Sequence, residues 1–303
     1  MLRIIESQSF LSRSINLFVM GRACRSMLTA ATLLGLVAVG QQAHAAPIVY
    51  GSFAGTTVDY LSVTEDANSA GDVPPLFGEP TTIGPVTPGY PAVPCVLCAI
   101  PGNSLDFDPT GFGASATGAA GIDLTDGNLT FTVVAHPGKA ISVLELSEAG
   151  DLTLAGVGTD ATSVSVTAVG VLNVLAVDGV GLFPTTISVP FSLTFTPSGT
   201  FGLVSDGGAS APFPFFSDWS GFLSKNIEQI LIDNSVSYTL GATQISVNLD
   251  NTLTAQSENG TVALIAKKEF GGLSVTVETI PEPATWLLLA ICGMAVGATR
   301  RSR

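Results

Sequence analysis

The sequence predicts a mainly β protein: an antiparallel β-sandwich or jelly-roll-like domain with one short helix, an N-terminal signal peptide and a C-terminal membrane-anchor helix. Three observations support this prediction. Apolar residues make up 46% of the chain and charged residues only 12%, and the polar remainder is rich in Ser, Thr, Asn and Gly, which suits strands and turns. Apolar and polar residues alternate in many short segments. Each end of the chain combines arginines with a short apolar run.

Alternation with a period of two is the main signal for strands. It is clearest from Ile187 to Phe195, where apolar residues occupy every second position. This period places the apolar side chains on one face of a pleated strand. We therefore expect about ten to twelve half-buried antiparallel strands in an exported domain that spans residues 46–279. The same pattern recurs at Phe131/Val133/Ala135, Val164/Val166, Val236/Tyr238/Leu240, Ile245/Val247/Leu249 and Val275/Val277, after a strand-like opening at Ile48–Val63.

Turn signals separate the alternating segments. Asn-Gly favours the tight turn of a β-hairpin, and Asn259-Gly260 lies between two alternating apolar sets, Leu253/Ala255 and Val262/Leu264/Ala266. We therefore expect a hairpin at this dipeptide. The other signals are Asp126-Gly127, Asp178-Gly179 and Gly241-Ala242.

One segment has helical spacing instead. Leu223, Ile227 and Ile230 recur at intervals of three and four, and Asp218 or Ser220 could cap the helix that they would form. We expect a short helix within Asp218–Asp233 that covers one end of the domain.

Prolines are concentrated at residues 72–102, where they predict an extended loop, because proline lacks the N–H group that a sheet ladder needs. This loop contains Cys95 and Cys98, the two cysteines of the exported domain. A local disulfide is the expected arrangement outside the cell, and a redox C-x-x-C site is the alternative. A structural zinc site would need two further ligands.

The exported domain is far more acidic than the whole chain. Between Ala46 and Ile280 there are four lysines and 22 Asp and Glu residues, a formal charge of −18. Such a domain has no basic surface for phosphates, so nucleic acid is excluded as a partner. Anionic lipid headgroups would repel it as well.

Residues 1–45 read as a signal peptide, with Met20 as an alternative start. Arg22 and Arg25 precede an apolar run, and Ala43-His44-Ala45 matches the small-x-small cleavage pattern. The mature chain is therefore expected to begin at Ala46. The alternative is an N-terminal membrane anchor, but the apolar run is shorter than the ~20 residues that a span needs.

The last residues, 280–303, are the most distinctive part of the sequence. Pro281-Glu282-Pro283 leads into an uncharged segment at about 284–299, and Arg300, Arg301 and Arg303 follow. Positive residues stay on the cytoplasmic side of a membrane, so this order places Pro281 outside. The whole arrangement resembles the PEP-CTERM sorting signal, which exosortases process in Gram-negative bacteria that make exopolysaccharide. The resemblance implies cleavage near the Pro-Glu-Pro motif.

No set of residues predicts catalysis. Asp106, Asp108, Asp123 and Asp126 could hold Ca²⁺, or two of them could serve a glycosidase, but Asp-rich loops more often form turns. His136 precedes Pro137-Gly138 and is expected in a solvated loop. No Gly-x-Ser-x-Gly motif accompanies it. No cofactor is expected, with Ca²⁺ as the exception that these carboxylates leave open.

These observations predict a non-enzymatic protein that crosses the inner membrane through the secretion machinery. Its tail would anchor it facing the periplasm until exosortase sends it to the cell surface or the extracellular matrix. Exopolysaccharide is the expected partner there. The alternatives are a Ca²⁺-assisted carbohydrate-binding or adhesion module and, less favoured, a secreted hydrolase.

Overall fold

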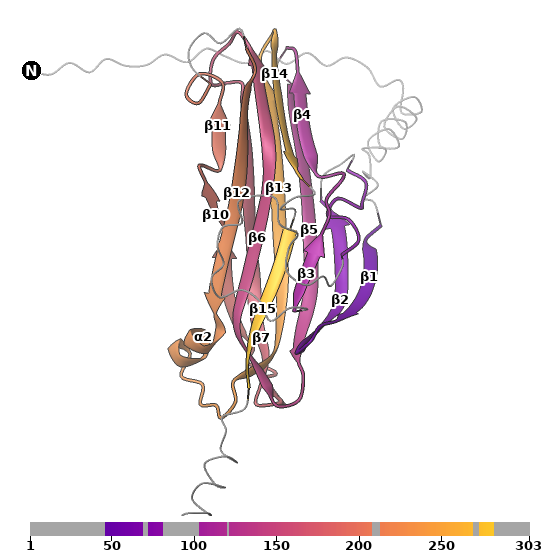
Figure 1. The fold of residues 1–303 in the computed structure, drawn as a ribbon, viewed down its shortest axis with the longest axis vertical. Coiled ribbons are helices and arrows are strands. Elements are labelled where there is room, and N and C mark those ends of the chain that lie inside the picture. Colours follow the sequence, from indigo (N-terminus) through magenta and orange to yellow (C-terminus); the bar gives the residue numbers. More distant parts are fainter. Residues whose placement is uncertain are drawn as a thin grey trace, which may run out of the picture. The chain divides into compact units, whose positions relative to one another are not determined.

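The computed structural model describes residues 46–68, 72–80, 103–119, 121–207, 213–268 and 273–281. All of them belong to one unit of the chain, His44–Arg303. Within these residues there are 15 β-strands and one α-helix, and the strands pair antiparallel throughout (Figure 1). The predicted class, mainly β with antiparallel strands and one short helix, is confirmed.

One group of strands is centred on β13 (Ala242–Ser257). This strand pairs with β5 (Gly121–Ala135) on one side and with β7 (Ser163–Val177) on the other. The group extends beyond β5 through β2 (Val58–Ala67) and β1 (Ile48–Ala54). The free side of β7 is covered by β8 (Val180–Gly181), β9 (Ile187–Ser192) and β11 (Thr200–Gly202).

The other group is centred on β6 (Lys139–Gly156). This strand pairs with β12 (Phe215–Asn226) on one side, and with β14 (Thr261–Lys267) and β15 (Leu273–Pro281) on the other. Short strands extend the group: β10 (Thr194–Thr196) on β12, β4 (Gly113–Thr117) on β14 and β3 (Ser104–Phe107) on β15. Among the described residues, the pairing of Ala242 with Ile141 links the two groups.

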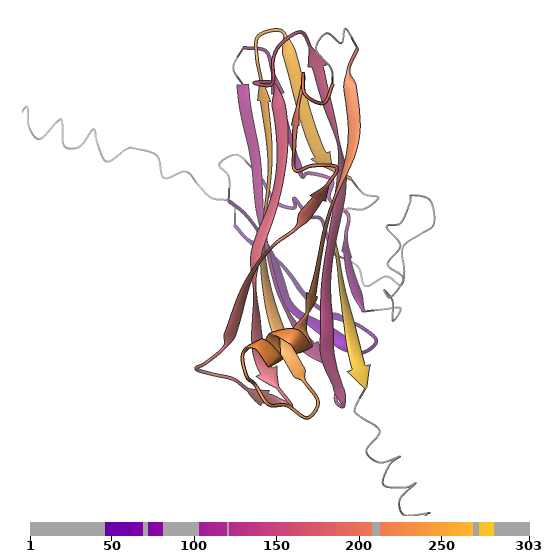
Figure 2. The ribbon, with the colours of Figure 1, turned by 90° about the vertical axis from the view of Figure 1, so that its left-hand side faces the viewer.

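The helix α2 (Ile227–Asp233) follows β12 directly. Both ribbon views place it at the end of the strands where β15 also finishes (Figures 1 and 2). Its N-cap is Asn226, whose side-chain oxygen accepts a hydrogen bond from the Gln229 N–H at 2.9 Å. Ile227 and Leu231 anchor the helix, because both are fully buried.

The core follows the alternation that the sequence predicts. Inward-facing residues of β13 such as Val247 and Leu249 are fully buried, and those of β6 such as Leu144 and Leu146 are buried as well. Side chains from both strand groups belong to one continuous buried cluster. The apolar positions of Phe131/Val133, Val164/Val166 and Ile245/Val247/Leu249 are therefore confirmed as core.

The hairpin predicted at Asn259-Gly260 is wrong, although a turn does form there. The Thr261 N–H donates to the Glu258 carbonyl at 3.1 Å, and Gly260 has a φ of +80°. The chain leaves β13 in one strand group and enters β14 in the other, where β14 pairs with β6 and β4. The buried face of β14 is also opposite to the predicted Val262/Leu264/Ala266 face, since Ala263 and Ile265 are buried while Leu264 is 39% exposed. Both faces of this strand are apolar, so the pattern alone did not distinguish them.

The turn predicted at Asp126-Gly127 is also wrong, because both residues lie inside the continuous strand β5. Close packing explains the glycine. A Cβ atom at Gly127 would lie 2.8 Å from Cε2 of Phe112 and 2.9 Å from Cε2 of Phe77. The glycine makes room for two aromatic rings instead of bending the chain.

The helix begins later than predicted, and a predicted strand is missing. Residues 218–226 continue β12, and helical structure starts at Ile227. Residues 236–240 form no strand, although Val236, Tyr238 and Leu240 alternate. Here Asp178 takes the place of a partner strand, since its carboxylate accepts the N–H groups of residues 239, 240 and 241 at 2.7–2.9 Å. Asp178-Gly179 itself forms the predicted turn between β7 and β8.

The described part of the Pro-rich segment, residues 72–80, contains no strand, as predicted. It packs inward through Leu76 and Phe77, which are almost fully buried. The Leu76 N–H donates to Oε1 of Glu65, a buried carboxylate that also accepts from the Tyr50 hydroxyl. Residues 81–102 lie outside the described part of the chain.

Candidate functional site

Three polar side chains meet in the core. Glu148 comes from β6, Lys267 from the end of β14 and Asn251 from β13. Lys267 pairs with Gly150, two residues from Glu148, so both side chains point to the same face of the sheet. Asn251 reaches them from the other strand group. Counted over the whole residue, Glu148 is 2% exposed, Lys267 is 3% exposed and Asn251 is 0% exposed. We call these three residues the buried triad.

The triad is organised around one oxygen atom. Lys267 Nζ donates to Oε2 of Glu148, and Asn251 Nδ2 donates to the same oxygen. Glu148 Oε1 and Asn251 Oδ1 are buried and accept no hydrogen bond from the described residues. Burial lowers the pKa of the Lys267 ammonium group, and Glu148 acts in the opposite direction.

Aromatic rings enclose the lysine end of the triad. Nζ of Lys267 lies 4.6 Å from the ring centroid of Phe112 and 5.4 Å from that of Phe77. Phe112 also packs edge-on against Phe77, with centroids 5.0 Å apart. A Cβ atom at Gly150 would lie 2.6 Å from Cζ2 of the buried Trp219, so a glycine is required beside this ring. The triad is therefore shielded from bulk water.

The four carboxylates predicted as Ca²⁺ ligands occupy separate places. Asp106 lies on β3 and Asp108 follows it; burial first, and then Asp108, raise the pKa of Asp106 to about 6. Asp123 accepts the Ser115 N–H at 2.7 Å. Three positions separate Asp123 from Asp126 on β5, so these two side chains point to opposite faces. Throughout the described residues, no group of three or more His, Cys, Asp or Glu side chains is placed to hold a metal ion.

A different carboxylate pair lies on the outer face of the β13 group. Burial, followed by a hydrogen bond and repulsion from Asp126, raises the pKa of Asp250 to about 6. Asp126 Oδ1 and Asp250 Oδ1 are both buried atoms without a hydrogen-bond partner among the described residues. The Asp250 carboxyl therefore keeps its proton at pH values well above those at which an ordinary aspartate ionises.

His136 lies just after β5, as predicted for a loop residue. Its Nε2 atom is 3.0 Å from Oδ1 of Asp59, and both side chains are more than a third exposed. No nucleophilic hydroxyl or thiol is within hydrogen-bonding distance of this imidazole among the contacts of the described residues. The pair connects the residue that follows β5 to strand β2.

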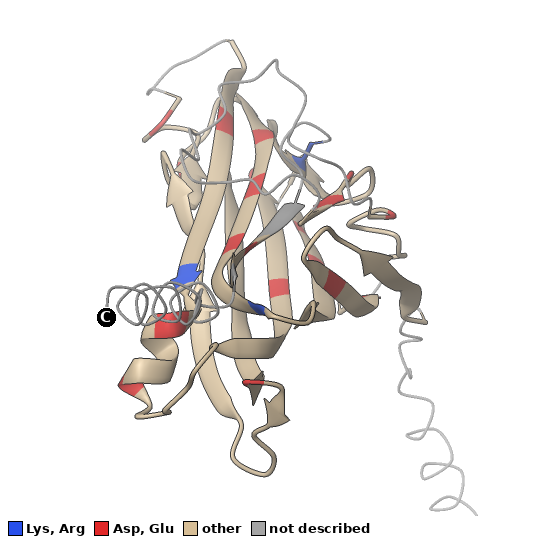
Figure 3. Ribbon diagram, turned by 60° about the horizontal axis from the view of Figure 1, so that its bottom comes forward, with Lys and Arg blue, Asp and Glu red and all other residues tan. Residues whose placement is uncertain are grey.

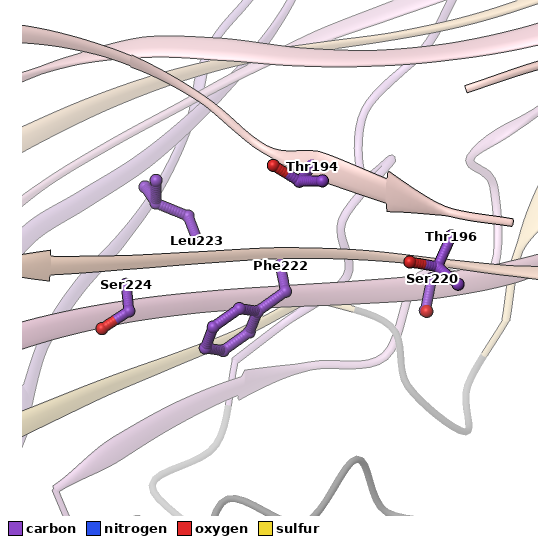
Figure 4. Close-up of a pocket in the computed structure, with 6 residues that line it drawn as sticks. All are labelled: Thr194, Thr196, Ser220, Phe222, Leu223 and Ser224. Carbon is purple, nitrogen blue, oxygen red and sulfur yellow. The ribbon is translucent and has the colours of Figure 1, made fainter. Parts of the chain in front are cut away.

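A shallow hollow of about 440 Å³ lies where β10 meets β12 (Figure 4). None of the side chains that line it is ionisable, so it offers hydroxyl groups and apolar surface only. The lining residues are Thr194, Thr196, Ser220, Phe222, Leu223 and Ser224.

Acidic residues are spread over many strands and loops of the described structure, and basic residues are few (Figure 3). Lys267 differs from the other described lysines because it is buried. Lys268, its neighbour in the chain, has a side chain that is 53% exposed and pairs with Asp151 at 3.2 Å.

Several predicted sites lie outside the described residues. They include Cys95 and Cys98, the cleavage positions Ala43 and Ala45, and the tail residues Glu282, Pro283, Arg300, Arg301 and Arg303. Ala46 is described and exposed, and Pro281 is the last residue of β15. In the part of the chain that is described, no helix has the length and apolar character to cross a membrane.

Comparisons with known proteins show no family for this chain. No family model matches it, and no curated protein matches it. Among solved structures, it is similar to the enzymatically active domain of tailspike protein 4 from bacteriophage CBA120, at 11% identity and a TM-score of 0.16, over 56% of this chain and 19% of that one. It is also similar to the VP2 subviral particle of infectious bursal disease virus, at 13% identity and a TM-score of 0.12, over 75% and 52%. The chain thus spans about a fifth of the first and half of the second, and scores this low indicate nothing about its function.

Sequence reasoning missed the buried triad. Its members are 16 to 119 positions apart, and their meeting depends on strands from both groups. One local signal was present: Ala263, Ile265 and Lys267 occupy every second position, so they lie on one face of a strand. A lysine that continues an apolar row is a candidate for burial with a partner.

Proposed function

We propose that this chain is an exported, non-enzymatic protein of the bacterial surface or extracellular matrix. Its PEP-CTERM-like tail would deliver it, and its β-domain would have a structural role in association with exopolysaccharide. We further propose that the two strand groups are the layers of a β-sandwich. The contact of Asn251 with Glu148 between the groups supports this arrangement, as does their shared buried cluster.

One observation supports the structural role most directly: several carboxylates of the domain accept hydrogen bonds from backbone N–H groups. Asp178 holds three consecutive backbone N–H groups. Asp160 accepts the N–H groups of Val204 and Ser205 at 2.7 and 2.9 Å, and the bond from Ser205 is the main reason that its pKa is lowered. Glu258 accepts the Thr159 N–H in the same way. Acidic side chains thus stabilise connections between strands.

The position of the sorting motif supports delivery by the tail. β15 remains paired with β6 as far as Pro281, which lies opposite Lys139. The first residue of the Pro-Glu-Pro motif is therefore also the last residue of the domain's final strand. A processing enzyme that cuts at this motif would release the whole β-domain and little else.

The proposal can be tested by fractionation of a Gram-negative host with and without an exosortase. The wild-type chain is compared with a variant that carries Pro281→Ala, Glu282→Ala and Pro283→Ala. The control carries Arg300→Lys, Arg301→Lys and Arg303→Lys, which preserves the cytoplasmic positive charge. We expect the wild type and the control at the surface only when exosortase is present, and the alanine variant in the inner membrane. Equal distribution of all three chains would contradict the proposal.

The alternative function, Ca²⁺-assisted carbohydrate binding, has its own test. Isothermal titration calorimetry with CaCl₂ should show no binding to the purified protein, and a chelator should leave its melting temperature unchanged. Heat of binding that Asp126→Asn abolishes would favour the alternative instead.

A further inference from the structure

The buried triad contains an amine, a carboxamide and a carboxylate, sealed in one place. Nζ of Lys267 and Nδ2 of Asn251 both contact Oε2 of Glu148, so the amine and the amide are neighbours across a single oxygen atom. We propose that Lys267 and Asn251 become joined by an intramolecular isopeptide bond, which the protein forms by itself with Glu148 as the catalytic proton carrier.

The environment of Lys267 favours a nucleophilic amine. An ammonium group in an apolar site is costly, and a buried lysine tends to lose its proton. Nζ is enclosed by the rings of Phe112 and Phe77, and burial lowers the pKa of this lysine. Glu148 is the acceptor already in contact with Nζ, so proton transfer from the ammonium to the carboxylate leaves a neutral amine beside a carboxylic acid.

The reaction is a transamidation and needs no other reagent. Nζ attacks Cγ of Asn251, and the new C–N bond forms as the carbonyl electrons move to Oδ1. Glu148 takes the proton that Nζ loses and gives a proton to Nδ2. The bond from Cγ to Nδ2 then breaks, the carbonyl forms again and ammonia leaves. The products are one secondary amide and one ammonia, and nothing is oxidised or reduced.

The contact geometry suits each of these roles. A single carboxylate oxygen touches both the nucleophile and the leaving group, so the proton can pass between them without rearrangement of Glu148. The aromatic rings keep out water, which would otherwise compete with the amine for Cγ. Each chain makes the bond once, so this chemistry is a maturation step and agrees with a non-enzymatic role.

The bond would tie together the two strand groups. Asn251 lies in the middle of β13, and Lys267 is the last residue of β14, which pairs with β6. A covalent link here closes the loop that contains Glu258 and Gly260 and fixes β14 to β13. Proteins outside the cell lack chaperones that could refold them. A cross-link that survives reducing conditions would stabilise the β-domain against unfolding, and no disulfide among the described residues does so.

The test is peptide mapping of the purified full chain by two proteases. In the bonded form trypsin cannot cleave after Lys267, so it yields the peptide 226–268 with a mass lower by about 17 Da, the mass of one ammonia. A protease that cleaves after glutamate cuts at Glu258, between the two bonded residues. It should yield one branched species that joins residues 229–258 to residues 259–269.

Linear peptides 229–258 and 259–269 from the folded wild type would overturn the proposal. This digest also separates the bond from a cyclic imide at Asn251, which loses ammonia too but leaves the two peptides apart. Fragmentation of the branched species by tandem mass spectrometry should place the junction on Lys267 and Asn251. A junction at any other pair of residues would overturn it as well.

Variants test the role of each group. Glu148→Gln keeps the shape of the side chain but cannot carry the proton, and Lys267→Arg removes the amine; both should give only linear peptides. Lys268→Arg, a matched change at the exposed neighbour, should keep the branch at the wild-type level. Asn251→Asp should form the same branch with loss of water, about 1 Da more than loss of ammonia. A full yield of branched peptide from Glu148→Gln would refute the assignment of Glu148.

Discussion

Lys267 and Glu148 form an ion pair in which neither side chain has any exposed surface. Removal of one partner from such a pair leaves the other charge buried without compensation, which costs about 3–5 kcal/mol. The free energies of unfolding of two variants of this pair can therefore be compared. The proposed bond between Lys267 and Asn251 does not affect the comparison, because neither variant can form it.

We expect Glu148→Gln to be less stable than the double variant Glu148→Gln with Lys267→Met. Only the single variant keeps an unpaired lysine in the core, so the difference in the free energy of unfolding should be about 3 kcal/mol in favour of the double variant. Urea denaturation followed by circular dichroism measures it. Equal midpoints for the two variants would show that Lys267 does not depend on Glu148.

Gly127 should be intolerant of a side chain even though it lies in a regular strand. Gly127→Ala would place Cβ 2.8 Å from Phe112 and 2.9 Å from Phe77, and overpacking of this kind costs about 1–3 kcal/mol. Gly181→Ala is the matched control, since its nearest neighbour would be 4.0 Å away, and it should change stability by less than about 0.5 kcal/mol. A Gly127→Ala protein as stable as the control would contradict the packing described for these rings.

Stability should decrease as the pH rises through the range in which Asp250 ionises. Its pKa of about 6 in the folded chain lies above the ordinary value of an aspartate. The folded state therefore holds this proton more tightly than the unfolded state does, and the stabilisation present at low pH is lost as the pH rises through about 6. Asp106, whose pKa is also raised to about 6, acts in the same direction.

Asp250→Asn tests this assignment, because an amide can donate to Asp126 at every pH. The variant should have a higher urea midpoint than the wild type at about pH 8, and the gain should shrink at about pH 4.5. Asp218→Asn, on the exposed surface of β12, should show no such pH dependence. A gain for Asp250→Asn that is the same at both pH values would argue against a raised pKa for Asp250.

Local patterns predicted several strands correctly but not their partners. The alternation of Ile245, Val247 and Leu249 identified a strand and its buried face, because the period of two is a property of the strand itself. Asn259-Gly260 identified a turn for the same reason. Whether the two flanking strands pair with each other or enter different strand groups depends on long-range contacts, and β14 joins β6 more than 100 positions away in the sequence.

The roles of single glycines and carboxylates were beyond sequence reasoning for a similar reason. Asp126-Gly127 has the composition of a turn, and the rings that require Gly127 come from residues 77 and 112. The alternation at Val236–Leu240 predicted a strand with a hydrogen-bonded partner strand. Instead, the carboxylate of Asp178 accepts the backbone N–H groups of residues that are 61 to 63 positions away. The buried triad depends on three strands, so its only local sign was that Lys267 continues the alternating apolar row of Ala263 and Ile265.

We propose that the β-domain is exported, trimmed at both ends and delivered to the surface. The most direct test is the intact mass of the protein recovered from the surface of cells that contain exosortase. We predict a mass that corresponds to a chain starting at Ala46 and ending near Pro281-Glu282-Pro283, without Arg300, Arg301 and Arg303. A mass that retains these arginines would contradict processing of the tail, and one that retains residues before Ala46 would contradict cleavage of the signal.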